Sequence, residues 1–166
     1  SATLDAAPVA ALMEGAPVLT SEGRAFPVER IWLDQPRPKA ERFENGMAAL
    51  IRRALAETTG GVLAFLPGEG EIRRTAAQLS DLPAGASLHP LYGALPFAEQ
   101  RAATRPPEQG RKLVLATSIA ETSLTIEGVH AVVDGGRARR ARFDPGSGMS
   151  RLVTEPASRA EAEQRA

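Results

Sequence analysis

Residues 113–126 read Leu-Val-Leu-Ala-Thr-Ser-Ile-Ala-Glu-Thr-Ser-Leu-Thr-Ile, and residues 130–136 read His-Ala-Val-Val-Asp-Gly-Gly. Each stretch contains a short apolar run of the kind that forms a buried strand. The first run stops at a hydroxyl-rich loop, and the second stops at a Gly-rich exit. In open α/β sheets, the loops after the carboxyl ends of the strands carry the ligand-binding groups. Hydroxyls and free backbone N–H groups in such loops favour phosphate as the ligand.

The rest of the chain alternates predicted strands with predicted helices. Short apolar runs indicate the strands, and apolar residues at helical spacing indicate the helices. Strands are expected at residues 26–33, 62–66, 87–91, 112–116 and 129–133, and helices at 39–57, 68–79 and 96–103. This order predicts an α/β fold with a parallel sheet and helices on both faces.

The alternation ends at a segment that predicts a β-hairpin near the C-terminus. Two extended runs, 138–143 and 149–154, flank the turn sequence Asp-Pro-Gly-Ser-Gly. Residues 137–154 contain five arginines and one acidic residue, Asp144. A basic hairpin can grip phosphate or wedge strands apart, although a charge run is usually only a solvated face. The candidate nucleic-acid-binding residues of this hairpin are Arg139, Arg140 and Arg142.

Composition excludes several other kinds of site. The chain has 20 basic and 20 acidic residues, so any attraction to nucleic acid has to be local. It has no cysteine, and its two histidines lack a nearby carboxylate pair, so we expect no metal site. No apolar run approaches the roughly 20 residues that span a bilayer. We therefore expect no membrane partner and a cytoplasmic location.

Residues 116–126, ATSIAETSLTI, resemble the fifth motif of the DEAH-box helicases of superfamily 2, which usually reads TNIAETSLTI. Other segments resemble further motifs in the family's order. Ser1-Ala2-Thr3 resembles the third motif, and residues 64–72, AFLPGEGEI, resemble the fourth. Residues 158–166 resemble the start of the sixth motif, QRAGRAGR, and stop after three of its residues. Residues 65–72 and 143–154 are most similar to the bacterial HrpB-type branch.

The resemblance implies a RecA-like fold and a division of the chain. Residues 1–22 would be the C-terminal tail of a first RecA-like lobe. Residues 23–166 would be the second lobe, the helicase C-terminal domain, cut within the sixth motif. Ser1 and Thr3 would take part in coupling between the lobes.

The resemblance also implies roles for single residues. Thr117 and Ser118 would contact the nucleic-acid strand, although Ser118 stands where the family usually has Asn. Ser123 and Thr125 would lie nearer the nucleotide, and Gln164 would reach toward the γ-phosphate and act in the catalytic cleft. The alternative for this hydroxyl-rich loop is a connector whose side chains cap helices.

Two further positions carry open alternatives. Gly68 allows a backbone to approach phosphate closely and is a candidate nucleic-acid contact, but it also suits an ordinary turn before a helix. Asp134 either orients the ribose of a bound nucleotide or holds the base of the hairpin.

The function implied is that of an ATP-dependent RNA or DNA helicase lobe, which grips the strand and forms half of an ATP cleft. Its partners would be single-stranded RNA or DNA and the first RecA-like lobe. ATP and Mg²⁺ would bind mainly to that first lobe, because these residues contain no phosphate loop, no Asp-Glu-Ala-His and no later arginines of the sixth motif. A polypeptide of these residues alone is expected to be inactive and to hold no cofactor tightly. The alternative is a non-enzymatic nucleic-acid-binding or scaffold domain.

Overall fold

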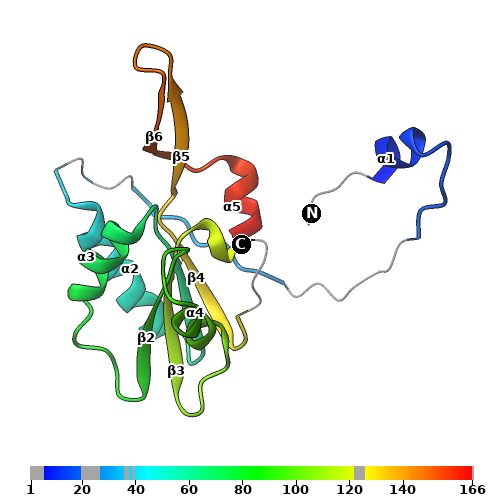
Figure 1. Ribbon diagram of the computed structural model, residues 1–166. Helices are drawn as coiled ribbons and strands as arrows, with labels where there is room; N and C mark the ends of the chain where they lie inside the picture. Colours follow the sequence, from blue (N-terminus) through cyan, green and yellow to red (C-terminus); the bar gives the residue numbers. More distant parts are fainter. Residues whose placement is uncertain (1–5, 20–26, 36–37, 39, 122–125, 166) are drawn as a thin grey trace. The chain divides into compact units, whose positions relative to one another are not determined.

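The computed structural model describes residues 6–19, 27–35, 38, 40–121 and 126–165 (Figure 1). The chain forms two compact units, Ser1–Leu33 and Asp34–Ala166. The first contains helix α1 (Ala6–Leu12), none of whose residues is buried. The division falls after residue 33, and the expected lobe boundary after residue 22 stays a prediction.

The strand expected at residues 26–33 does not form in the described part of that segment, residues 27–33. The apolar pattern that suggested it is present, but Val28, Ile31 and Trp32 are 60%, 63% and 78% exposed. An extended segment becomes a strand only when a neighbour pairs with its backbone, and these residues have no such neighbour in the described chain. This prediction was therefore wrong.

The second unit is built on a four-stranded parallel sheet with strand order β2-β3-β1-β4. Its strands are β1 (Gly61–Phe65), β2 (Ala86–Leu91), β3 (Arg111–Ala116) and β4 (Val129–Asp134). Helix α2 (Phe43–Glu57) precedes β1, α3 (Glu69–Ala77) connects β1 to β2, and α4 (Phe97–Thr104) connects β2 to β3. Pro90 lies in edge strand β2, where the missing N–H of proline is tolerated.

The helices cover both faces of the sheet, as expected for a parallel sheet. Strand β1 is buried throughout, and its alternate residues enter two different cores. Val62 and Ala64 pack with residues of α2 and α3, including Ile51 and Ile72. Leu63 and Phe65 pack on the other face with Ala103 of α4 and with residues of β3. The predicted α/β architecture is confirmed.

The carboxyl ends of the four strands lie in register at one edge of the sheet. Phe65 of β1 pairs with Ala116 of β3 on one side and with Asp134 of β4 on the other. Ala116 in turn pairs with Leu91 of β2. Each strand therefore ends in the same row, and the loops that follow them meet at one edge.

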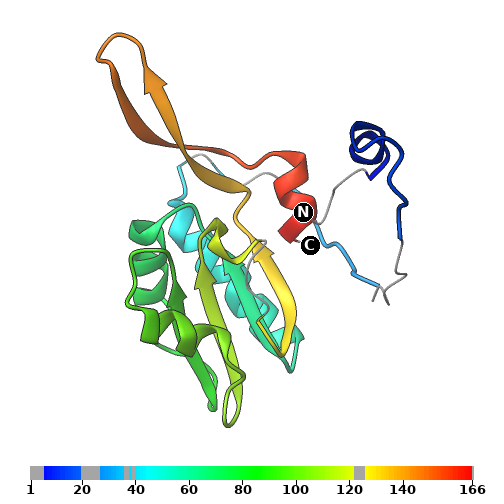
Figure 2. The ribbon, with the colours of Figure 1, turned by 45° about the vertical axis from the view of Figure 1, so that its right-hand side comes forward.

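A two-stranded antiparallel hairpin follows β4 and extends beyond that edge (Figures 1 and 2). Strands β5 (Arg137–Asp144) and β6 (Met149–Pro156) pair along their whole length, so the predicted hairpin is confirmed. In its turn, Asp144 accepts hydrogen bonds from the Gly146 N–H and the Ser147 hydroxyl, and Gly148 has a φ of +66°. The left-handed conformation of Gly148 favours glycine there. Helix α5 (Arg159–Arg165) comes next.

Thr75 is fully buried on α3, and its hydroxyl has no hydrogen-bond partner among the described residues. An unsatisfied buried polar group costs about 1–3 kcal/mol. We therefore expect Thr75→Val, which keeps the shape of the side chain, to raise the free energy of unfolding by about 1 kcal/mol. Urea unfolding of the chain measures this change. Thr75→Ser keeps the hydroxyl and removes the methyl group, so it should destabilise; equal stability of the two variants would contradict the explanation.

Candidate functional site

The loop after β3 begins with Thr117 and the 3-10 turn η1 (Ser118–Ala120). The Thr117 N–H donates to the Leu91 carbonyl at 3.1 Å, which fixes the start of the loop against β2. Thr117 is half-buried, Ser118 is exposed, and Ala120 packs into the second core. The Thr117 hydroxyl does not cap the turn. Helix capping, which was the alternative explanation for Thr117, therefore does not account for this residue.

Gly68 caps the N-terminus of α3 and lies directly against the hairpin. A side-chain carbon at Gly68 would come within 2.7 Å of the Arg139 guanidinium. The structure thus brings together two candidates that are far apart in the sequence. Arg139 also pairs with Glu71 of α3 at 3.3 Å, and Glu71 pairs with Arg74 at 2.9 Å. The guanidinium of Arg139 therefore places a positive charge beside the N-terminus of α3.

The other candidate arginines of the hairpin are ion-paired as well. Arg142 binds both carboxylate oxygens of Glu155, with each hydrogen bond 2.8 Å long. Arg140 pairs with Glu161 of α5 and lies 3.8 Å from Glu155. The hydrogen bond to Arg142 holds the pKa of Glu155 below its usual range. Charge in the hairpin is therefore more balanced than residues 137–154 suggest, because the carboxylates come from outside that window.

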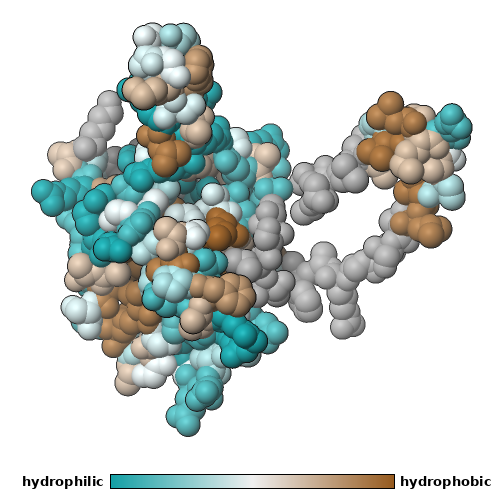
Figure 3. Space-filling model, viewed as in Figure 1, coloured by the Kyte–Doolittle hydropathy of each residue, from teal (hydrophilic) through white to brown (hydrophobic). Residues whose placement is uncertain are grey.

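The other two hairpin arginines, Arg137 and Arg151, make no ion pair with a carboxylate among the described residues. Arg137 lies over the ring of Phe43, 4.8 Å from its centre, in a cation–π contact. Arg151 is exposed, and within the described residues no ion pair involves it. The hairpin also exposes Phe143, Met149 and Leu152, which are 65–68% exposed, and Figure 3 shows hydrophobic residues on the hairpin surface.

Asp134, at the end of β4, holds the base of the hairpin. Its carboxylate accepts a hydrogen bond from the Gly136 N–H at 2.8 Å and from Arg165 at 2.7 Å. Arg165 is buried and also pairs with Glu121 at 2.7 Å. Burial opposes the charge on Arg165, but its hydrogen bonds to Asp134 and Glu121 prevail and raise its pKa. These contacts match one of the two alternatives for Asp134; nucleotide binding by this residue stays a prediction.

The remaining candidates divide between described and undescribed parts of the chain. Gln164 is half-buried on α5, next to Arg165. Ser1, Thr3, Ser123 and Thr125 lie outside the described residues. Sequence reasoning missed Glu121 and Arg165 as a pair, and no local pattern indicates them. It also missed the capping box Ser158-x-x-Glu161 at the start of α5, which the sequence pattern indicates.

Comparison with known proteins gives long matches at high identity. No protein-family model matches the chain. It is 50% identical over its whole length to the ATP-dependent RNA helicase HrpB of Escherichia coli strain K12, and covers 20% of that protein. It is 38% identical, over 99% of its length, to the pre-mRNA-splicing factor ATP-dependent RNA helicase prp22 of Schizosaccharomyces pombe, and covers 15% of it.

The solved structures agree. Two crystal structures of Escherichia coli HrpB, one described as a DExH-box NTPase and the other as a DEAH/RHA helicase, each match 98% of the chain at 48% identity. Their TM-scores are 0.85 and 0.86, and the chain covers 20% and 21% of them. The chain is homologous to a segment of the HrpB-type DEAH-box helicases. The resemblance seen in the sequence motifs is confirmed, and the segment spans about a fifth or less of the relatives' length.

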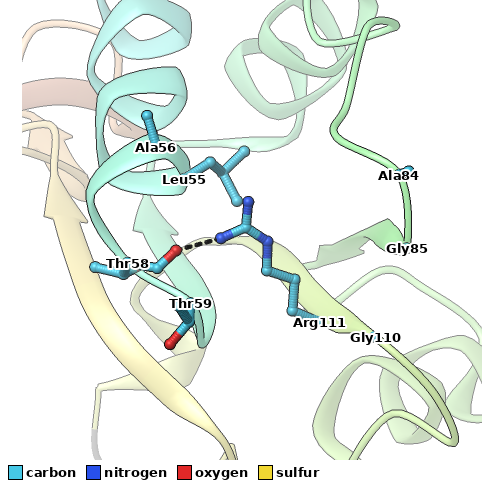
Figure 4. A pocket seen from close by; sticks show the side chains of 8 residues that line it. All are labelled: Leu55, Ala56, Thr58, Thr59, Ala84, Gly85, Gly110 and Arg111. Carbon is cyan, nitrogen blue, oxygen red and sulfur yellow. Dashed lines mark hydrogen bonds between the residues drawn. The ribbon is translucent and has the colours of Figure 1, made fainter.

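A hollow of this HrpB-like segment lies at the other edge of the sheet. It has a volume of about 500 Å³ and is lined by the end of α2 and the loops before β2 and β3, including Thr59, Gly85 and Arg111 (Figure 4). Arg111, one of the lining residues, donates a hydrogen bond to the Thr58 carbonyl. None of the candidate site residues lines this hollow.

Two other findings concern the described residues alone. They contain no group of three metal-ligating side chains, and no helix among them is long and apolar enough to cross a membrane. Tyr92 is 8% exposed within the first core, and its hydroxyl donates a hydrogen bond to Glu69 at 3.3 Å.

The attachment of the hairpin to α5 should depend on pH through Glu161. Hydrogen bonds from the Ser158 N–H, the Ser158 hydroxyl and Arg140 hold the pKa of Glu161 below its usual range, against the effect of burial. Because the folded-state pKa is lowered, this stabilisation is complete above the ordinary value of about 4.3 and is lost as the pH falls through the lowered value.

We therefore expect Glu161→Gln to destabilise the fold at neutral pH, and the difference from wild type to shrink below about pH 4. Thermal unfolding across the pH range measures it. Glu163→Gln is the matched control, because it breaks an exposed pair with Arg159 on the same helix and should have little effect. A difference for Glu161→Gln that stays constant with pH would contradict this account.

Proposed function

We propose that this segment forms the strand-gripping wall and one side of the ATP cleft in an ATP-dependent RNA helicase. The observation that carries the proposal is the register of the strand ends. Phe65, Ala116 and Asp134 lie in one row, so the Gly68 turn, the Thr117 loop and the hairpin base meet at one edge. That edge is where open α/β sheets bind phosphate-containing ligands. Both curated relatives are named ATP-dependent RNA helicases.

The strand would be held through its sugar-phosphate backbone. A helicase moves along any sequence, so it has to bind phosphates and sugars and not base edges. The exposed Ser118 and the half-buried Thr117 offer hydroxyls in a loop whose backbone is fixed by β2 and the second core. Gly68 and the hairpin arginines Arg139, Arg140 and Arg142 would contribute further phosphate contacts.

The nucleotide would bind between this lobe and a first RecA-like lobe. ATP and Mg²⁺ would supply the phosphoryl-transfer chemistry, and the first lobe would hold most of both. On this side, Gln164 would orient toward the γ-phosphate, with Ser123, Thr125 and Asp134 nearer the rest of the nucleotide. Closing and opening of the cleft would then move the lobes along single-stranded RNA or DNA, in the cytoplasm.

The tail at residues 1–22 would complete the first lobe. Its helix α1 buries none of its residues, and Leu12 and Met13 are 86% and 63% exposed. Apolar side chains of this kind are normally covered by a neighbouring layer. Ser1 and Thr3 would lie at the junction and couple the two lobes.

Thr117 provides the direct test of strand binding. In a full-length helicase that contains this segment, Thr117→Ala should weaken single-stranded RNA binding by about 1.5–3 kcal/mol, roughly ten- to a hundredfold, because one hydrogen bond to a charged acceptor is lost. ATP affinity without RNA should change less. Fluorescence anisotropy measures the RNA affinity. Thr59→Ala, at the opposite edge of the sheet, is the matched control. Equal RNA affinity for wild type and Thr117→Ala would remove Thr117 from the site.

The hairpin provides a second test, based on salt. Arg151 and Arg142 are cross-strand neighbours, but in the described part of the chain only Arg142 of the two pairs with a carboxylate, that of Glu155. Phosphate contacts release counterions, and each contact contributes about 0.7–0.9 to the log–log slope of affinity against salt. We expect Arg151→Ala to lower the slope by about that amount and Arg142→Ala to lower it less. If Arg151→Ala keeps the wild-type slope, Arg151 does not contact phosphate. If Arg142→Ala also keeps it, this cross-strand pair is only a solvated surface.

A further inference from the structure

The guanidinium of Arg165 is the centre of a buried ionic cluster at the carboxyl edge of the sheet. We define the Arg165 cluster as Arg165, Glu121 and Asp134. Arg165 lies 2.7 Å from a carboxylate oxygen of each acidic residue and donates to the Arg137 carbonyl at 3.4 Å. Its guanidinium also lies 5.1 Å from the centre of the Phe65 ring. The side chain of Arg165 is 2% exposed, and that of Glu121 is 10% exposed.

Arg165 and the three residues to which it donates hydrogen bonds belong to different parts of the candidate site. Glu121 follows η1 in the hydroxyl-rich loop, and Asp134 ends β4. Arg137, whose carbonyl accepts from Arg165, is the first residue of β5, and Arg165 itself is on α5 beside Gln164. One guanidinium therefore joins the loop proposed to grip the strand, the base of the hairpin and the helix proposed to face the γ-phosphate.

The geometry of arginine makes the connection between the loop, the hairpin base and α5 rigid. A guanidinium is planar, always charged and presents its N–H donors in a rigid fork, so it fixes several acceptors in one geometry. If Glu121 or Asp134 moved away from Arg165, the guanidinium would keep a buried charge without its partner. This cost strongly disfavours separating the carboxylates from Arg165. The loop, the hairpin base and α5 should therefore move together when any one of them moves.

We propose that Arg165 is a positioning residue that couples the nucleotide side of this lobe to its strand-gripping loop through Glu121. This inference rests on the proposed helicase function. A shift of α5 when Gln164 engages nucleotide is transmitted through the guanidinium to Glu121, which is four residues after Thr117. The hydrogen bond from Arg165 to Asp134 carries the same shift to the base of the hairpin. Neither Arg165 nor Glu121 touches nucleotide or strand in this role.

The test uses the full-length helicase and its stimulation by nucleic acid. The stimulation factor is the ATPase rate with saturating single-stranded RNA divided by the rate without RNA. Glu121→Gln keeps the size of the side chain and removes the charge that orients Arg165. We expect it to lower the stimulation factor at least about fivefold, the lower end of typical coupling between two sites. Glu163→Gln, the same change at an exposed pair on α5, should leave the factor unchanged.

A double-mutant cycle with Arg165→Lys separates coupling from general destabilisation. Lysine keeps the charge but loses the fork, so Arg165→Lys should lower the stimulation factor, and the double variant should be no worse than the more severe single variant. Melting temperatures are measured in parallel. If both variants lower the melting temperature and keep the wild-type stimulation factor, the cluster only stabilises the fold and the proposal is overturned.

The outcome for the wild-type protein distinguishes this proposal from the function on which it rests. A wild-type enzyme whose ATPase does not respond to RNA would contradict the proposed function itself. A responsive wild type with equally responsive variants would contradict only the role of Arg165. If Arg165→Lys does not fold, the isosteric Glu121→Gln variant decides the question alone.

Discussion

The rest of this structure depends on the burial of β1 between two cores. Every residue of that strand is buried, and alternate side chains pack against helices on opposite faces. A one-residue slip of the strand would exchange the two sets of side chains, so the register is strongly specified. That register aligns Phe65 with Ala116 and Asp134. Apolar packing therefore brings the ends of the strands, and the loops that follow them, to one edge of the sheet.

The hairpin carries less unpaired positive charge in the fold than its composition suggests. The hairpin looks basic in the sequence, but Arg139, Arg140 and Arg142 each have a carboxylate partner in the fold. Such pairs at the surface contribute little stability individually, yet they orient the side chains. A phosphate would have to compete with these carboxylates, which makes grip by these arginines easier to reverse. Reversible grip suits a protein proposed to move along a strand.

Much of the fold could be predicted, because most of its helices and strands depend on patterns of residues that are close together in the sequence. The strands β1 to β4, the helices α2 to α4 and the hairpin follow from apolar periodicity and turn residues, and all were confirmed. The expected strand at residues 26–33 failed because pairing requires a neighbour, which periodicity does not reveal. In the site, Gly68 and Arg139 were chosen separately, and only the fold makes them neighbours.

The sequence by itself determined the fold class, the order of the motifs and the likeness to DEAH-box helicases, because each depends on residues close together in the chain. Only the tertiary structure decided which charges meet. Arg139 and Glu71 are 68 positions apart, Arg165 and Glu121 are 44 apart, and Arg165 and Asp134 are 31 apart. Ion pairs between such distant residues form where the packed sheet and helices bring them within reach, and a buried arginine is stable only where its acceptors converge.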